Sequence, residues 1–554
     1  MKITIHDRTY SSFCVDDNLS NQNEVDPINL KLFNGDEFSY TDSVFNLINS
    51  PTRNAPYLTG ILNLDDNKTF GRTRNQKRLM YKCSPDDKKL PSFLIPYDID
   101  VKFNKKHKNK FILFKFDEWN KFDAHPIGLI IETIGNVDDI ESIFSYNLYS
   151  KHLLHSIKSF TKQTYQLCKQ PHSNTTQECK SFVFSIDPHN CQDFDDAFSV
   201  EFNNNKYCVS VFIADVVSNI EKHQLWDSFS ERVSTIYLPN KRLPMIPQQY
   251  THTFCSLNQN KISKSICVKS YFNADGTPDD SMNSIYFTDV FVNKNFEYEE
   301  QSLLDNADYS KLLHLTQQIE VSSQRENLDL KLRSSNADKI KPTTKDSHEL
   351  VSFWMVKTNY FIADFLNRSE KGIFRKSTIT NDFKNNIFDR NVVSAQYVSF
   401  DDIEMNGLKI YTHATSPIRR IPDLLNQCII HSIICPSSFS IEASNFILYW
   451  SSRLDFVNKS MKSIRKVQSE CRLIDFFHNK PNIHEQTFEG IILHKKINDE
   501  FSFTYTVFVK ELKVYSKIRS NLELNELSVI EVCYYYLSNK VRCALTEKKE
   551  MKVN

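Results

Sequence analysis

The stretch SIDPHNCQDFDDAFSV, residues 185–200, places four aspartates within ten positions: Asp187, Asp193, Asp195 and Asp196. Apolar FVFSI precedes the first of them, and the strand-like KYCVSVFIADVV follows the last. Crowded carboxylates repel and raise one another's pKa values, so this arrangement needs compensating cations or donors. Oxygen donors without thiol or imidazole partners suit Mg²⁺, with Mn²⁺ as a substitute, better than zinc. The stretch therefore predicts a divalent-metal site beside a buried strand.

Two other kinds of structure could contain these aspartates. A calcium-binding EF-hand loop that starts at Asp193 would need Gly at its sixth position and Glu at its twelfth, where this chain has Phe198 and Asn204. A plain exposed acidic turn between two strands stays open. A further strand-end aspartate, Asp215 in VFIADVV, favours a site.

Length and composition set the limits around this motif. A chain of 554 residues exceeds one hydrophobic core and indicates about three or four domains. Lys plus Arg and Asp plus Glu are equal at 68 each, so a polyanionic partner would need local basic patches. The 13 cysteines form no CxxC pair, which argues against a disulfide framework and a zinc site. With no signal peptide and no long apolar run, we expect a soluble intracellular protein in the cytoplasm or the nucleus, without membrane contact.

The pattern of apolar residues along the chain changes twice. Short strand patterns separated by turn residues, typical of small barrels, extend to about residue 165. Longer apolar periodicities of three and four residues then mix with strands up to about residue 480, and strand patterns return after that, about as many as a five-stranded OB barrel needs. The predicted fold class is α+β and multidomain.

A second motif, YTHATSPIRRIPDLL at residues 411–425, could hold a phosphate. Ser416 and Pro417 predict a helix start, with Arg419 and Arg420 in its first turn. Helix N-termini attract anions, and arginine adds a bidentate fork for phosphate. Taken alone the motif is weak, because paired arginines often belong to a solvated face.

Three segments together resemble the RNB family, which contains ribonuclease II, ribonuclease R and the catalytic subunit of the eukaryotic exosome. They are the aspartate stretch with YCVSVFIADVV, RVSTIYLPNKRLPMIPQQYTHTFCSLNQN at residues 232–260, and THATSPIRRIPDLLN at residues 412–426, in the family's order. The resemblance implies Mg²⁺-dependent hydrolysis of single-stranded RNA from the 3′ end to nucleoside 5′-monophosphates. It also implies that the four aspartates are catalytic and metal-binding, that Arg419 stabilises the phosphate, and that Tyr237 clamps the terminal base. We add Arg420, Ser416, Pro417 and Trp119 as substrate-binding candidates.

The flanking segments fit the same resemblance. The expected domains are a partial first cold-shock-like OB barrel (residues 1–56), a second such barrel (57–165), the RNB catalytic domain (166–482) and an RNA-binding OB barrel (483–554). Fewer than 200 residues precede the catalytic domain, so we expect no separate endonuclease domain. Single-stranded RNA is the expected partner, with an exosome-like complex as a second candidate and no DNA.

Aromatic and basic residues offer candidate RNA contacts. Three phenylalanines and Trp119 follow the basic run VKFNKKHKNK at residues 101–110, and single strands are gripped by cations and stacked aromatic rings. Because strand alternation buries part of such a set, barrel packing is the competing interpretation for Phe111, Phe114, Phe116 and Trp119. Lys459, Lys462 and Lys466 share one helical face, which is equally typical of a solvated surface.

The chain departs from the family pattern at several positions. Phe212 replaces a frequent His and is expected to pack. Ile421 replaces a Tyr, Gln427 and Cys428 replace a His-Arg pair, and Gln468 stands where a glutamate aligns, which puts rate or product handling in doubt. Two other function classes therefore stay open: a catalytically weak RNA-binding subunit of an RNA-degradation complex, and a metal-dependent DNA exonuclease.

Overall fold

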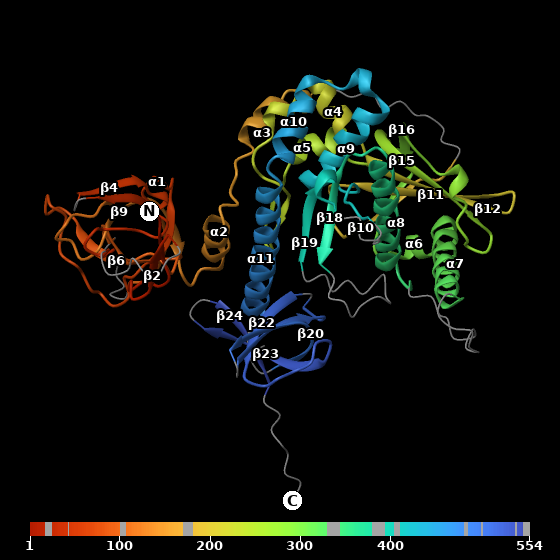
Figure 1. Cartoon of the computed structure of the whole chain (residues 1–554). Helices are drawn as coiled ribbons and strands as arrows, with labels where there is room; N and C mark the ends of the chain where they lie inside the picture. Colours follow the sequence, from red (N-terminus) through yellow and green to blue (C-terminus); the bar gives the residue numbers. More distant parts are fainter. Residues whose placement is uncertain are drawn as a thin grey trace, which may run out of the picture. The chain divides into compact units, whose positions relative to one another are not determined.

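The computed structural model describes residues 1–16, 25–41, 44–99, 107–169, 181–329, 344–378, 394–403, 410–480, 486–499, 502–512, 514–537 and 540–546. Figure 1 draws the elements of the chain in sequence colours. The chain divides into two compact units. One unit holds residues 1–154, 238–240 and 465–554, and the other holds residues 155–237 and 241–464. Within the described ranges no helix combines the length and apolar character needed to cross a bilayer.

The N-terminal segment forms two short antiparallel ladders around a small core. Their strands are β1 (Ile3–Ile5), β2 (Phe13–Val15), β3 (Glu37–Thr41) and β4 (Val44–Asn49), followed by helix α1 (Pro51–Asn54). Buried Asp36 accepts hydrogen bonds from Ser50 Oγ at 2.6 Å and Arg53 Nη1 at 2.7 Å, which ties α1 to the turn before β3. The described part of this segment is consistent with a short first barrel, and its boundary at residue 56 stays a prediction.

The next domain is a closed barrel of five strands, ordered β5-β6-β7-β9-β8 as in an OB fold. The strands are β5 (Leu58–Leu62), β6 (Leu79–Pro85), β7 (Phe93–Tyr97), β8 (Lys110–Glu118) and β9 (Ile127–Asn136), and helix α2 (Ile140–Ser150) follows. Gly60 allows the strands to approach closely, because a Cβ atom there would lie 2.6 Å from Cys83 Sγ. Phe93 and Phe114 are fully buried in the barrel core.

The C-terminal domain repeats this architecture. Its five antiparallel strands are ordered β22-β21-β20-β23-β24, with β22 and β24 also adjacent. The strands are β20 (Thr487–Asp499), β21 (Ser502–Val509), β22 (Val514–Ser520), β23 (Val529–Leu537) and β24 (Lys540–Leu545). Strict alternation along β21 buries Phe503, Tyr505, Val507 and Val509, as a one-sided barrel strand requires.

The catalytic region expected from the sequence is built on a six-stranded sheet, ordered β16-β15-β12-β11-β10-β17. Its strands are β10 (Phe184–Asp187), β11 (Asp196–Asn203), β12 (Lys206–Ala214), β15 (Lys261–Asn273), β16 (Ser284–Val292) and β17 (Lys294–Glu297). All neighbours are antiparallel except β10 and β17. This sheet and the two OB-type barrels confirm the predicted α+β, multidomain fold class.

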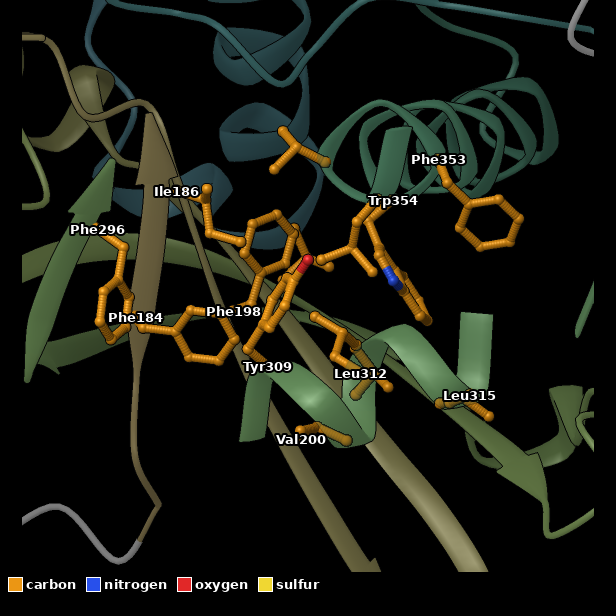
Figure 2. Close-up of a cluster of buried hydrophobic side chains, with 14 of the residues drawn as sticks. Phe184, Ile186, Phe198, Val200, Phe296, Tyr309, Leu312, Leu315, Phe353 and Trp354 are labelled. Atoms are coloured by element: carbon orange, nitrogen blue, oxygen red, sulfur yellow. The ribbon is translucent and has the colours of Figure 1, made fainter. Parts of the chain in front are cut away.

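Two long helices cover the apolar face of this sheet, α7 (Ala307–Asp329) and α8 (Ser347–Arg368). The close-up in Figure 2 shows Phe184, Ile186 and Phe198 of the sheet meeting Leu312 and Trp354 of these helices. Alternate residues of each strand point the same way, so this core fixes which side of the sheet each strand end presents. The positions of Asp187 and Asp196, at the ends of β10 and β11, are set by this packing.

Further elements belong to residues 155–480, and the last of them continues into the other compact unit. They are the hairpins β13 (Ile236–Tyr237) with β14 (Arg242–Leu243) and β18 (Ile373–Thr378) with β19 (Ser394–Ser399), and the helices α3 (Lys158–Thr164), α4 (Val216–His223), α5 (Gln248–Tyr250), α6 (Gln301–Leu304), α9 (Ile421–Ile434), α10 (Ile441–Ser451) and α11 (Leu454–Asn479). Helix α9 packs against both α4 and α10.

The predicted helix start at Ser416 and Pro417 is wrong. Helix α9 begins at Ile421, with Pro422 in its first turn and Arg420 as the N-cap residue. Residues 417–420 form a turn in front of it, so Arg419 is presented from a turn and not from helical backbone. The sequence contains a second proline at a suitable position, and tertiary contacts decide between the two.

Candidate active site

The aspartate stretch is a loop between two paired strands. Asp187 is the last residue of β10 and Asp196 the first of β11, and these strands pair antiparallel through Phe184 and Phe198. The Phe194 N–H donates to Ser256 Oγ at 2.8 Å, and the Phe194 carbonyl accepts from Leu257 N–H at 3.0 Å. Because Phe194 is held on both sides, its neighbours Asp193 and Asp195 have fixed positions.

Asp195 meets Arg419 across 224 residues of sequence. Arg419 Nε donates to Asp195 Oδ2 at 2.9 Å, and the Ile418 N–H donates to Asp195 Oδ1 at 3.1 Å. A terminal nitrogen of Arg419, Nη2, donates to Ser416 Oγ at 3.0 Å. The Asp195 side chain is buried, whereas that of Arg419 is 41% exposed. The turn therefore holds a half-exposed guanidinium directly on the acidic loop.

Ser416, Pro417 and Arg420 support this turn from within. Arg420 Nη2 donates to Asp423 Oδ1 at 2.7 Å, and the Ser416 N–H donates to the same oxygen at 2.9 Å. Ser416, Pro417 and Asp423 are buried, and the Arg420 side chain is only 20% exposed. Ser416 and Arg420 therefore make internal contacts that shape the turn around Arg419, and Pro417 is buried beside them in the chain.

Asp193 has a different cation. Its carboxylate forms an ion pair with Arg242, and its Oδ1 accepts a hydrogen bond from Thr251 Oγ1 at 3.1 Å. Arg242 also lies over the Tyr237 ring, with its Cζ atom 5.8 Å from the ring centroid. Sequence reasoning missed Arg242, because one arginine in a hairpin carries no spacing signal.

Asp187 and Asp196 have no such cation among the described residues. Cys191 Sγ donates a weak hydrogen bond to Asp187 Oδ1 at 3.7 Å, and Asp187 Oδ2 is buried without a hydrogen-bond partner. Burial first, and then the charges of Asp187 and Asp195, raise the pKa of Asp196 well above its usual range. Burial also raises the pKa of Asp187, with the Asp195 charge acting in the same direction.

Tyr237 is accessible at the edge of this group. It ends β13, opposite Arg242 in β14, and is 42% exposed. Burial raises the pKa of its hydroxyl, on which the charges of Arg419 and Asp195 act in opposite directions. An exposed aromatic ring held near the aspartates is suited to stack on a base.

Tyr298 is a second aromatic neighbour, which the sequence did not reveal. Its ring stacks on His348 at 3.7 Å between centroids, and its N–H donates to the Asp187 carbonyl at 3.1 Å. Burial, together with the charges of Asp196 and Asp187, raises the pKa of its hydroxyl. No sequence signal identifies it, because Tyr298 lies outside the three segments that carry the motifs.

Trp119 does not extend this aromatic set. Its ring packs against Phe33 at 5.1 Å between centroids, its Nε1 donates to the Asp123 carbonyl at 3.1 Å, and Lys31 covers it at 5.2 Å. Phe111 and Phe114 are buried, so barrel packing accounts for most of the aromatic set beside the basic run. Residues 101–106 of that run lie outside the described residues.

The donor set fits a divalent cation. Among the described residues no three acidic, histidine or cysteine side chains already converge as a preformed metal cage. Asp187 and Asp196 nevertheless supply carboxylate oxygens that form no ion pair among the described residues, and Asp187 Oδ2 is buried without a hydrogen-bond partner. Mg²⁺ is held through one or two carboxylates plus substrate phosphates, so a complete protein cage is not required. Asp187 and Asp196 are the residues that would hold it.

Two departures from the family pattern have structural compensation. Buried Gln427 accepts from the N–H groups of Val216 and Val217 at 2.9 and 3.1 Å, which caps helix α4, and donates to the Ala214 carbonyl at 2.8 Å. Phe212 is 9% exposed, as expected for a packing residue. These positions maintain the scaffold behind the acidic loop.

Sequence comparison identifies the domains. Residues 177–392 match the RNB domain, and residues 80–145 match the Dis3-like cold-shock domain 2 (CSD2). This chain is an RNB-domain protein. The RNB domain spans the sheet, the acidic loop and the Tyr237 hairpin, while the CSD2 match covers most of the closed barrel.

Relatives of this RNB-domain protein include ribonucleases. Ribonuclease R of Mycoplasmopsis pulmonis is 24% identical over 442 residues, covering 67% of this chain and 59% of the relative. The matched segments span 17–60% of the first curated relatives' length. Mycoplasma genitalium RNase R, solved with ribose-methylated single-stranded RNA, superposes with a TM-score of 0.65 at 17% identity, over 98% of this chain and 100% of that one. Yeast Ssd1, described as a pseudonuclease, has a TM-score of 0.55 at 14% identity, over 89% and 69%.

Proposed function

We propose that this RNB-domain protein is a hydrolytic exoribonuclease that degrades single-stranded RNA from the 3′ end to nucleoside 5′-monophosphates with Mg²⁺. The observation that carries the proposal is the contact of Arg419 with Asp195, at 2.9 Å, beside two carboxylates, Asp187 and Asp196, that form no ion pair among the described residues. A phosphodiester needs this combination, because its attacking water, its leaving oxygen and its phosphoryl charge all require stabilisation.

Each residue then has a defined task. Arg419 commits Nε to Asp195 and Nη2 to Ser416, so its other N–H groups, which have no partner among the described residues, face the phosphate. Tyr237 stacks on the terminal base, and Asp187 with Asp196 binds the cation. When bound, Mg²⁺ polarises a phosphate oxygen and lowers the pKa of a coordinated water.

The fold alone does not decide activity, because a pseudonuclease shares it. An RNA-binding protein without catalysis needs no buried carboxylates that repel one another, since such an arrangement costs stability. The retained acidic group with its arginine therefore favours an enzyme. An exosome-like assembly is a further proposed partner, to be tested by co-purification.

The test uses a 5′-labelled RNA and the Asp195→Asn variant. The wild-type protein is expected to shorten the RNA from its 3′ end in Mg²⁺ and to stop when a chelator is added. Asp195→Asn is expected to lose about 10²–10³-fold in rate, because it releases Arg419 from its position, while it still binds RNA. The matched control is Asp289→Asn, an exposed acidic residue of the same domain paired with Lys264.

Two results contradict the proposal. One is an unchanged rate in Asp195→Asn. The other is hydrolysis of a DNA oligonucleotide of the same sequence at a comparable rate, which would favour the DNA exonuclease, because an RNA-selective site recognises the 2′-hydroxyl.

A further inference from the structure

The four aspartates of the acidic loop fall into two classes by their partners. Asp193 is paired with Arg242, and Asp195 with Arg419. Within the described ranges Asp187 and Asp196 form no ion pair, and Asp187 Oδ2 is buried without a hydrogen-bond partner. Asp193 and Asp195, within the loop, are thus each paired with an arginine side chain. Asp187 and Asp196, at the strand ends, are not, in the described part of the chain.

One hairpin fixes both arginines. Arg242 lies in β14 with Tyr237 opposite it in β13. Just before β13, the Thr235 N–H donates to the Arg419 carbonyl at 3.0 Å, and Ser234 Oγ donates to the same carbonyl at 2.8 Å. The Arg242 guanidinium and the Arg419 backbone are therefore positioned by a single piece of secondary structure, which makes both cations part of the framework.

We propose that Arg242 is a built-in counter-ion of Asp193 that takes the place of a second divalent cation, so that the acidic loop binds one such ion, at Asp187 and Asp196. Four ionised carboxylates carry four negative charges, and the two arginines return two positive ones. The remaining charge equals that of one divalent ion. This inference rests on the proposed function and specifies its metal stoichiometry.

The surroundings of Arg242 favour a lasting ion pair with Asp193. Its side chain is 22% exposed and that of Asp193 4%, so the pair is largely withdrawn from water. Thr251 Oγ1 donates to Asp193 Oδ1 at 3.1 Å, whereas Asp193 Oδ2 has no hydrogen-bond partner among the described residues and meets Arg242 only as an ion pair. Removing one partner of a buried ion pair leaves an uncompensated charge, which a small cation can neutralise in its place.

The experiment counts bound Mn²⁺ per chain by isothermal titration calorimetry on the full, metal-stripped protein. We expect one site in the wild type, two in Arg242→Gln and one in Arg242→Lys, which keeps the charge. The matched control is Arg368→Gln, which breaks an exposed pair with Asp364 in the same domain and should leave one site. In chelator, Arg242→Gln should melt below the wild type, and Mn²⁺ should raise its Tm by more than it raises that of the wild type.

Two sites in the wild type, or one site in a folded Arg242→Gln, overturn the inference. If Arg242→Gln does not fold, the wild-type stoichiometry decides alone. Two wild-type sites together with Mg²⁺-dependent RNA hydrolysis would remove the inference and leave the proposed function standing. No Mn²⁺ binding at all would overturn both.

Discussion

Two neighbouring strand ends bury aspartates in opposite surroundings. Asp196 opens β11 opposite Ile213 of β12, and Asp215 directly follows β12. Asp215 accepts hydrogen bonds from the Ser218 N–H at 3.0 Å and from His431 Nε2 at 2.9 Å. Burial acts to raise the pKa of Asp215, but the contact with His431 and the cap of α4 lower it overall. For Asp196 the result is reversed: burial and the like charges of Asp187 and Asp195 raise its pKa more than the charges of Arg419 and Arg420 lower it.

The difference separates a carboxylate of the scaffold from a carboxylate of a site. Asp215 completes a closed network, in which Gln427 caps the same helix, and needs no ligand. Asp187 and Asp196 cost stability until a cation joins them. The aspartates of both regions are buried, so burial does not distinguish them. The presence or absence of hydrogen-bond and charge partners does.

The largest expected effect is on catalysis by Asp187→Asn or Asp196→Asn. Loss of a cation-binding carboxylate should reduce the hydrolysis rate by about 10²–10³-fold. The same variants should raise Tm in chelator, because one of the repelling charges is gone. Single-turnover rates and thermal melts measure both effects, with Asp289→Asn as the control. If a variant had a lower hydrolysis rate and also a lower Tm in chelator, its aspartate would stabilise the fold, as Asp215 does, and would not be a cation ligand.

The scaffold side of the comparison is tested by Asp215→Ala. This change removes the cap of α4 and the partner of His431, and should cost about 3 kcal/mol in the free energy of unfolding. Urea denaturation measures it, and the rate per folded molecule should stay near that of the wild type. If Asp215→Ala had the same free energy of unfolding as the wild type, the hydrogen bonds of Asp215 would not be what stabilises this part of the domain.

A smaller loss is expected for Gln427→Leu. The substitution keeps the buried volume but leaves the Val216 and Val217 N–H groups and the Ala214 carbonyl without their side-chain partner. The expected cost is about 2 kcal/mol, since unsatisfied buried polar groups are destabilising. Unfolding by urea, compared with Asp215→Ala, checks whether the two residues stabilise one network.

The smallest effect is a pH dependence of cation stabilisation. The raised pKa values of Asp187 and Asp196 mean that their repulsion is absent below the unfolded-state pKa of about 4 and grows as the pH rises through the folded-state values. Mg²⁺ should therefore raise Tm little near about pH 5 and more near about pH 8. Asp215, with a lowered pKa, contributes stability above about pH 4 and loses it only below, so its contribution stays flat over the same range.

Melting curves with and without Mg²⁺ across this range measure the effect. Asp187→Asn should flatten the dependence, and Asp215→Ala should shift all curves down without changing their slope. An equal Mg²⁺ effect at both ends of the range would show that the two strand ends do not differ as described.

The sequence predicted the acidic loop and Arg419 because each lies in a motif with its own spacing, and the order of the motifs added specificity. It did not predict Arg242, whose role depends on a hairpin register. For Trp119 it left RNA contact and barrel packing both open, because strand alternation alone does not decide which face the ring takes. It misplaced the start of α9, because Pro417 and Pro422 both suit a first helical turn and only tertiary contacts choose between them. Local patterns determined the elements, and long-range contacts determined which side chains met.

The most direct test of the central claim is anomalous diffraction from crystals of the full protein soaked in Mn²⁺. The account predicts one peak, bonded to the carboxylates of Asp187 and Asp196 at about 2.1 Å, with Arg242 still on Asp193 and Arg419 on Asp195. A loop without a peak, or a peak on Asp193 in place of Arg242, would contradict it.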